Sequence, residues 1–240
     1  MTETELWLVD LEQAAAAIEA LEATTPRLSD DLILRLAAMS DEPSRRERRL
    51  AHIALRIALE RKLGPSVRRI PFASTPSGKP SLADSKMDFS LAHTKGLALI
   101  AISERTPIGV DIERPREVRM PDARRGPIEA EAIALAAGKP LNGSGTDARF
   151  LSAWARIEAV AKARGSGVGP LLERLRPGGG RPQGDAPKAA CDLVAHDLPA
   201  GNDIFAAVAL PVGVVPPTLG LLPETVQAIA RLLEADHGSR

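Results

Sequence analysis

Four charged residues in the middle of the sequence stand at spacings that suit chemistry on a phosphate group. Asp111 and Glu113 are two residues apart in a β-branched stretch, so on a strand their side chains point to the same face. Glu158 and Lys162 are four residues apart in an alanine-rich stretch, so on a helix they share a face. Three carboxylates gathered from a strand and a helix would suit Mg²⁺, which prefers oxygen ligands and usually binds substrate phosphates as well. The lysine would then face those phosphates.

Each of these residues also has a purely structural interpretation. Asp111 and Glu113 could form a solvated strand end before Pro115. Glu158 and Lys162 could form an exposed ion pair, which would contribute only about 0.3–0.5 kcal/mol to stability. We favour the chemical interpretation because both runs occur in one chain, where an acidic strand and an acidic helix can meet at one cation.

Three blocks of sequence carry a family resemblance. Gly109–Glu113 resembles the motif Gly-Val/Ile-Asp-Ile/Val-Glu, and Trp154–Lys162 with the following Gly165–Gly167 resembles Trp-x-x-Lys-Glu-Ala/Ser-x-x-Lys and Gly-x-Gly. Gly78–Pro80 and Phe89–Thr94 are similar to Gly-Lys-Pro and Phe-Asn-x-Ser-His-Ser. Together and in this order, the blocks resemble the signature of the 4′-phosphopantetheinyl transferases, of the long, two-lobed type that acts as a single chain.

The resemblance implies an activity and a set of catalytic residues. The chain would transfer the 4′-phosphopantetheine arm of coenzyme A to a serine of an acyl, polyketide or peptidyl carrier protein domain and release 3′,5′-ADP. Mg²⁺ would sit on Asp111, Glu113 and Glu158 and bind the diphosphate. Glu158 would also take the serine proton, and Lys162 would neutralise charge on the leaving group.

The resemblance also implies which residues bind coenzyme A. His93 would meet the 3′-phosphate, and Arg35 and Arg48 would bring positive charge to the same phosphate. The residues expected around the nucleotide are Lys79, Pro80 and Thr94. Arg48 belongs to the basic run 45–49, which could equally be a solvated helix face.

Two departures from the family pattern leave an alternative open. Ile157 stands where the family has a lysine, and Ala92 stands where it has a serine. If the missing cation matters, the chain could be a degenerate member that binds coenzyme A or a carrier domain without chemistry. We expect an active enzyme in which Arg156, or a residue of the basic run, compensates. A further alternative is a different magnesium-dependent phosphate enzyme. The block around His93 argues against it, because in the family that block belongs to the coenzyme A site.

Composition excludes several other classes of protein. Lys plus Arg and Asp plus Glu number 31 each among 240 residues, so no global field draws the chain to nucleic acid or to a membrane surface. Tyrosine is absent and aromatic residues make up 2% of the chain, so stacking platforms for single-stranded nucleic acid are hard to build. No apolar run approaches the roughly 20 residues that span a bilayer. We therefore expect neither nucleic acid nor a membrane as a partner.

The cysteine content and the N-terminus bear on the compartment. Cys191 is the single cysteine, which excludes an internal disulfide framework and is compatible with a reducing cytosol. Residues 1–5 are acidic and lack the basic region of a signal peptide. We expect a cytoplasmic protein that is a monomer.

Periodicity predicts alternating helices and strands. Helices are predicted over 11–21, 29–36, 45–63, 127–137, 147–164 and 223–235, and strands over 6–11, 67–72, 87–91, 97–103, 108–112, 189–196 and 204–210. The three strands between residues 87 and 112 suggest an antiparallel meander. A helix followed by strands occurs in each half. This predicts a pseudo-duplicated α+β fold of two lobes, residues 1–115 and 116–240, each a small, mainly antiparallel sheet with a long helix packed on it. The active site would lie between the lobes.

Overall fold

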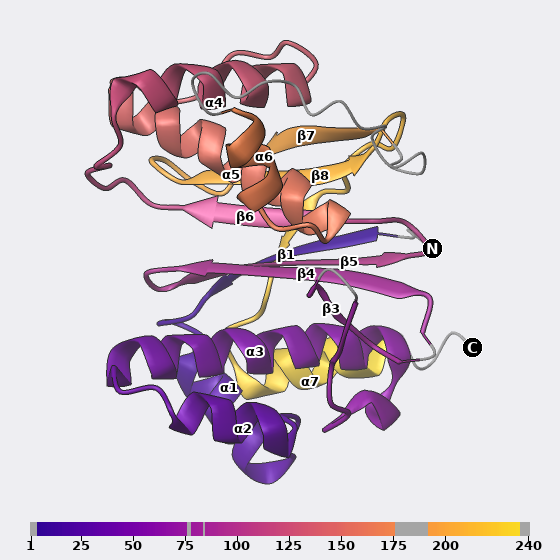
Figure 1. Ribbon diagram of the computed structural model, residues 1–240. Helices are drawn as coiled ribbons and strands as arrows, with labels where there is room; N and C mark the ends of the chain where they lie inside the picture. The colour runs from indigo at the N-terminus through magenta and orange to yellow at the C-terminus, as the bar shows by residue number, and fades with distance from the viewer. Residues whose placement is uncertain (1–3, 76–77, 84, 176–191, 236–240) are drawn as a thin grey trace.

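Two β-sheets lie one above the other, and helices cover the outer face of each sheet (Figure 1). The computed structural model describes residues 4–75, 78–83, 85–175 and 192–235. Within these residues the α+β class predicted from the sequence is confirmed, and the sheets are mainly antiparallel. Cys191 lies outside the described residues.

The strands form two main sheets and one short hairpin. The first sheet has the order β4-β5-β1-β9 and consists of β1 (Thr4–Asp10), β4 (Met87–Thr94), β5 (Leu97–Glu104) and β9 (Leu219–Leu221). The second has the order β6-β8-β7 and consists of β6 (Gly109–Glu113), β7 (Leu193–Leu198) and β8 (Phe205–Pro211). The hairpin consists of β2 (Ala73–Ser74) and β3 (Pro80–Ser81). Of these pairs, β1 and β9 run parallel and the others antiparallel.

The helices fall into two groups, one for each sheet (Figure 1). On the side of the first sheet lie α1 (Ala15–Thr24), α2 (Asp30–Ala37), α3 (Glu42–Leu63), the 3₁₀ helix η1 (Pro65–Val67) and α7 (Val226–Ala235). On the side of the second sheet lie α4 (Asp122–Leu135), α5 (Thr146–Arg164) and α6 (Gly169–Arg174). Among the described helices, none combines the length and the apolar character needed to cross a bilayer.

Three hydrophobic cores hold these layers together. Ile100 of β5 belongs to the core between the first sheet and its helices, and Ile157 of α5 belongs to the core between the second sheet and its helices. The third core fills the space between the sheets with Leu99, Val110 and Val208, each 0% exposed. Neighbouring residues of β5 thus point into different cores, as strand geometry requires. Because Val110 and Ile112 of β6 point into the third core, Asp111 and Glu113 point to the opposite face of the strand, where Asp111 meets α5.

The two long helices predicted from periodicity are confirmed. Helix α3 begins at Glu42, slightly before the predicted start, because the side chain of Asp41 accepts a hydrogen bond from the backbone N–H of Ser44 at 2.9 Å. Helix α5 ends at Gly165, whose φ of 69° is the left-handed conformation predicted for a C-cap there. Trp154 on α5 packs against the second core, and its ring stacks on Phe150 with centroids 5.9 Å apart.

One predicted strand and one predicted strand pairing are wrong in the first half of the chain. Residues 67–72 do not form a strand, because the guanidinium of Arg56 donates to the carbonyls of Val67 and Ile70 at 3.2 and 2.6 Å and holds an irregular segment there. The meander fails at its third member, because β6 pairs with β8 and not with β5. An apolar run with both faces buried predicts a strand without indicating its partner.

The division of the chain into lobes at residue 115 stays a prediction. Strand β6 precedes that residue and joins the second sheet. Strand β9 and helix α7 follow it by a hundred residues, yet β9 pairs with β1, and Ile229 of α7 is buried in the first core. The chain therefore passes from the first sheet to the second after β5 and returns after β8.

Candidate active site

Strand β6 and helix α5 bring Asp111 and Lys162 together. The Nζ atom of Lys162 lies 2.7 Å from Oδ1 of Asp111, and Asp111 is 8% exposed. Burial raises the pKa of Asp111 to about 7; Lys162 opposes this rise, and the charges of Glu158 and Glu113 add to it. The raised pKa of Asp111 therefore reflects mainly the cost of burying its charge, which Lys162 only partly offsets.

The two other acids of the cluster, Glu158 and Glu113, lie close enough to Asp111 to interact with its charge. Burial raises the pKa of Glu158, Lys162 opposes the rise, and the charge of Glu113 adds to it. The side chain of Glu113 accepts from Nη2 of Arg116 at 3.1 Å. Within the described parts of the chain, no three acidic, histidine or cysteine side chains are placed so that they could hold a metal ion as they stand. The assignment of Mg²⁺ to Asp111, Glu113 and Glu158 therefore stays a prediction.

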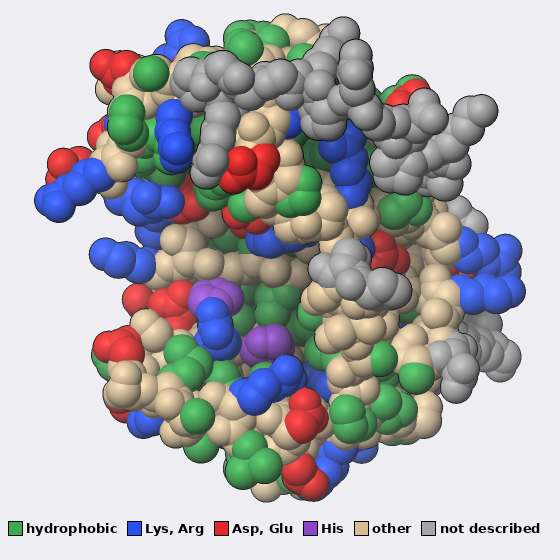
Figure 2. All heavy atoms as spheres, in the orientation of Figure 1, with side chains coloured by type: hydrophobic (Ala, Val, Ile, Leu, Met, Phe, Trp, Pro, Cys, Tyr) green, Lys and Arg blue, Asp and Glu red, His purple; other side chains and the backbone are tan. Residues whose placement is uncertain are grey.

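A cavity of about 380 Å³ lies beside this cluster. Its walls come from α3, the β2–β3 segment, β4 and the end of α5. It brings together five residues that the sequence analysis assigns to coenzyme A or to catalysis, namely Arg48, Lys79, Pro80, His93 and Lys162. Figure 2 shows histidine and basic side chains gathered in the hollow between α3 and the end of α5.

Three further lining residues were not assigned from the sequence: His52, Phe72 and Phe89. His52 lies one helical turn after Arg48 on α3, and this spacing of four residues is a signal that could have revealed it. The rings of Phe72 and Phe89 lie 4.7 Å apart, and the guanidinium of Arg56 lies 3.7 Å over the ring of Phe72. The cavity thus has an aromatic wall as well as a basic one.

Lys79 is already engaged by neighbouring groups. Its Nζ donates to Oδ2 of Asp88 at 2.5 Å and to the carbonyl of Ile108 at 2.9 Å. The same Asp88 oxygen accepts from the backbone N–H of Ile108, and Oγ of Ser90 accepts from the N–H of Val110 at 3.1 Å. Side chains of β4 thus take the place of a backbone ladder to β6. Lys79 helps to fix the strand that carries Asp111, and a phosphate role for it stays a prediction.

Two residues predicted to bind coenzyme A do not line the cavity. The side chain of Arg35 is 67% exposed and pairs with Asp31 at 2.9 Å. Its charge is nevertheless among those that lower the pKa of His52, after burial and the charges of His93, Arg48 and Arg56. Thr94 ends β4 and is half-buried outside the cavity wall. Their contacts with a nucleotide stay predictions.

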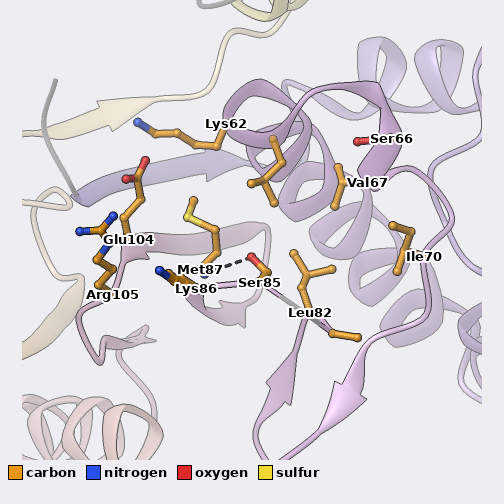
Figure 3. A pocket seen from close by; sticks show the side chains of 12 residues that line it. Lys62, Ser66, Val67, Ile70, Leu82, Ser85, Lys86, Met87, Glu104 and Arg105 are labelled. Carbon is orange, nitrogen blue, oxygen red and sulfur yellow. Dashed lines mark hydrogen bonds between the residues drawn. The ribbon is translucent and has the colours of Figure 1, made fainter.

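A second cavity of about 430 Å³ lies at the other end of β4, between the end of α3 and residues 82–83 and 85–87 (Figure 3). None of the residues assigned from the sequence lines it. Its most buried cation, Lys62, pairs with Glu5 at 2.8 Å, so that charge is already balanced. The first cavity, which adjoins Lys162, is therefore the better candidate for a substrate site.

Gly109→Ala is expected to destabilise the protein, whereas Gly126→Ala is not. A Cβ at Gly109 would lie 2.1 Å from the carbonyl oxygen of Ala159 and 2.3 Å from the nitrogen of Ala163, so β6 could not approach α5. Such overpacking costs about 1–3 kcal/mol or more. A Cβ at Gly126 in α4 would meet nothing within 4 Å, and alanine there should be neutral or stabilise the helix by about 0.5–1 kcal/mol. Urea unfolding of both variants measures the difference, and equal midpoints would contradict the close approach.

Acidification is expected to destabilise the protein through His52. Burial, followed by the charges of His93 and Arg48, lowers the pKa of His52 from 6.5 to about 4. Between these values the unfolded chain binds a proton that the folded chain does not. The free energy of unfolding therefore falls as the pH falls, by about 3 kcal/mol from this group across the window. Urea unfolding at pH 7 and at about pH 4.5 measures the loss, which should be smaller in His52→Gln; an equal loss in both proteins would assign it to other groups.

The expectation that Arg156 compensates for the missing lysine is wrong. Arg156 is 0% exposed, and its guanidinium donates to both carboxylate oxygens of Asp197 at 2.8 and 2.6 Å and to the carbonyls of Lys139 and Pro140. The Arg156 side chain therefore points away from the cavity and into the interface between α5 and β7. Ile157 is also 0% exposed and belongs to the core between the second sheet and its helices.

Comparison with known proteins places the chain in a family. It is 30% identical over 177 residues to the 4′-phosphopantetheinyl transferase HetI of Nostoc sp., a match that covers 71% of this chain and 72% of that protein. It is also 30% identical over 132 residues to a putative 4′-phosphopantetheinyl transferase of Synechocystis sp., where the match covers 52% of each chain. No family model matches the chain.

The chain therefore belongs to the 4′-phosphopantetheinyl transferase family. The resemblance stated from the three sequence blocks is confirmed at this level. Membership also argues against the alternative of an unrelated magnesium-dependent phosphate enzyme.

Proposed function

We propose that the protein transfers the 4′-phosphopantetheine arm of coenzyme A to a serine of a carrier protein domain. The observation that carries the proposal is the meeting of β6 and α5, where Lys162 contacts Asp111 at the edge of the cavity lined by Arg48 and His93. A diphosphate needs positive charge beside it, and the adjoining acids need a cation to share the site with a diphosphate. Family membership supports the same activity.

The carboxylate cluster is suited to a hard divalent cation. Asp111 and Glu158 both have raised pKa values, first because of burial, and the three acids repel one another, which a bound dication would relieve. Asp111, Glu113 and Glu158 would hold Mg²⁺, which would supply Lewis-acid polarisation of the diphosphate. Lys162 would then exchange Asp111 for a phosphate oxygen.

The reaction itself uses the protein's own groups at two points. The serine oxygen of the carrier attacks the phosphorus atom that bears the pantetheine arm, and the bond from that phosphorus to the oxygen of the leaving 3′,5′-ADP breaks. Glu158 takes the serine proton, a role favoured by burial, which raises the pKa of its carboxyl above the ordinary value. Lys162 meets the charge that develops on the leaving group.

The alternative of a degenerate, binding-only member rests on Ile157 and Ala92. Both are buried, at 0% and 5% exposure, and both belong to hydrophobic cores. Neither side chain lines the cavity. The two departures are thus explained by packing in this chain, and they give no reason to expect a loss of chemistry.

The direct test is the mass of a carrier domain after co-expression with this protein. The carrier should gain the mass of one phosphopantetheine arm, and a carrier whose acceptor serine is replaced by alanine should gain nothing. Purified protein with coenzyme A and Mg²⁺ should reproduce the gain. Unmodified acyl, polyketide and peptidyl carriers in both experiments would contradict the proposed activity.

Coenzyme A is expected to stabilise the folded protein, and more strongly with Mg²⁺ present. A ligand that binds only the folded state raises the free energy of unfolding by about 2.7 kcal/mol at one hundred times its Kd. Thermal unfolding with and without each ligand measures the shift. Stabilisation without transfer would support the degenerate member, and the absence of any shift would contradict both hypotheses.

A further inference from the structure

Glu47 of α3 links the helix to the end of β4 through both of its carboxylate oxygens. Oε1 lies 3.1 Å from Nδ1 of His93, and Oε2 accepts from the backbone N–H of Gly96 at 3.4 Å. Both side chains of the Glu47–His93 pair are 26% exposed. Glu47 does not itself line the cavity, but His93 does. Any effect of Glu47 on a bound ligand must therefore pass through His93.

The contact decides which ring nitrogen of His93 remains for a ligand. With Nδ1 held by Glu47, Nε2 is the nitrogen left for a group in the cavity. The doubly protonated ring donates from both nitrogens at once, so it can satisfy Glu47 and an anion together. A carboxylate behind a histidine is a common way to fix the orientation of the ring and its hydrogen-bonding state.

The surroundings of His93 favour an anion. Arg48 follows Glu47 on α3 and lines the same cavity, as does His52 one turn further on. The Nδ1 atom of His52 is buried without a hydrogen-bond partner among the described residues. Burial lowers the pKa of His52, and the charges of His93 and Arg48 lower it further. These charges place positive potential at this wall. An anionic group would relieve that potential.

We propose that Glu47 is a positioning residue that aims Nε2 of His93 at a phosphate monoester in the cavity, and that it thereby helps the protein select coenzyme A over dephospho-coenzyme A. The inference rests on the proposed function and on the family resemblance, which implies that His93 meets the 3′-phosphate. It adds a residue that the three sequence blocks do not contain. It also assigns a task to the Glu47–His93 contact, which would otherwise be only a tie between α3 and β4.

The test compares two ligands that differ in the 3′-phosphate alone. Calorimetric titration with Mg²⁺ present gives the Kd of coenzyme A and of dephospho-coenzyme A for the wild type, Glu47→Leu and Glu47→Gln. Glu47→Leu should weaken coenzyme A about tenfold, as expected for loss of a partner that orients a ligating histidine. It should leave dephospho-coenzyme A unchanged. Glu47→Gln keeps an acceptor for Nδ1 and should lose less.

A double-mutant cycle separates positioning from a general structural effect. In a His93→Ala background, Glu47→Leu should have no further effect on coenzyme A, because the residue through which it acts is gone. The control Glu224→Gln removes an exposed carboxylate outside the cavity and should leave both affinities unchanged. Unchanged binding of dephospho-coenzyme A also verifies that each variant is folded.

Three outcomes would overturn the inference. Equal losses for both ligands, or an equal loss with and without His93, would show that Glu47 acts only on the fold. A wild type that binds the two ligands equally would show that the 3′-phosphate is not recognised, while transfer of the arm could still be intact. A wild type that binds neither ligand would contradict the proposed function as well.

Discussion

Asp111→Asn is expected to reduce transfer of the phosphopantetheine arm by at least about 10²–10³-fold while leaving the fold intact. Asparagine keeps the size of the side chain and an oxygen that can accept from Lys162, but it removes the charge that a divalent cation requires. Because burial raises the pKa of Asp111 to about 7, the ionised form is costly without a cation. The substitution should therefore change the free energy of unfolding by no more than about 1 kcal/mol.

Mass spectrometry of a carrier domain measures the transfer, and circular dichroism on the same sample verifies the fold. Glu117→Gln is the matched control, since it removes a nearby carboxylate whose side chain is 75% exposed. That variant should transfer the arm at the wild-type rate. A near-normal rate for Asp111→Asn would exclude Asp111 as a metal ligand.

The carboxylate cluster could be predicted from the sequence because its parts depend on local periodicity. Asp111 and Glu113 share a face through the two-residue repeat of a strand, and Glu158 and Lys162 share a face through the helical repeat. That the strand and the helix meet came from the family resemblance and not from these repeats. The contact between Lys162 and Asp111 was not predicted, because the lysine was assigned to phosphate alone.

The features that escaped prediction depend on contacts between distant parts of the chain. The partner of β6 is a strand nearly a hundred residues later, and an apolar run carries no information on its pairing. The packing of the two sheets around Val110 and Val208 likewise depends on contacts between segments that are far apart in the sequence. Glu47 sits on a helix whose basic run gives no sign that its side chain meets His93 of β4.

Ile157 shows how a departure from a family motif can mislead. From the sequence, the isoleucine reads as a lost cation beside the phosphate site. On α5, however, Ile157 lies about 100° around the axis from Glu158, and this turns it into the core between the second sheet and its helices. Its neighbour Arg156 is likewise engaged, by Asp197. Position 157 thus belongs to the family motif, but in this chain its side chain does not lie on the side of the helix that faces the cavity.

Ile157→Lys is accordingly expected to destabilise the protein by about 3–5 kcal/mol and not to raise kcat/KM for coenzyme A. The side chain is 0% exposed, so the ammonium would be buried without a partner. Small domains are stable by only about 5–15 kcal/mol, so much of the protein would unfold in mild denaturant. Urea unfolding measures the loss, and transfer assays at low temperature measure the activity of the folded fraction.

Ile157→Met separates the effect of charge from that of shape. Methionine is unbranched and about as long as lysine but neutral, and such a swap usually costs less than about 1.5 kcal/mol. A large loss in both variants would attribute the effect to the branched shape of isoleucine. A wild type without detectable transfer, together with an Ile157→Lys variant that gains it, would instead mean that the missing cation matters. The binding-only hypothesis would then hold for the natural chain. In the variant, the buried position would have to open to let the lysine reach a phosphate.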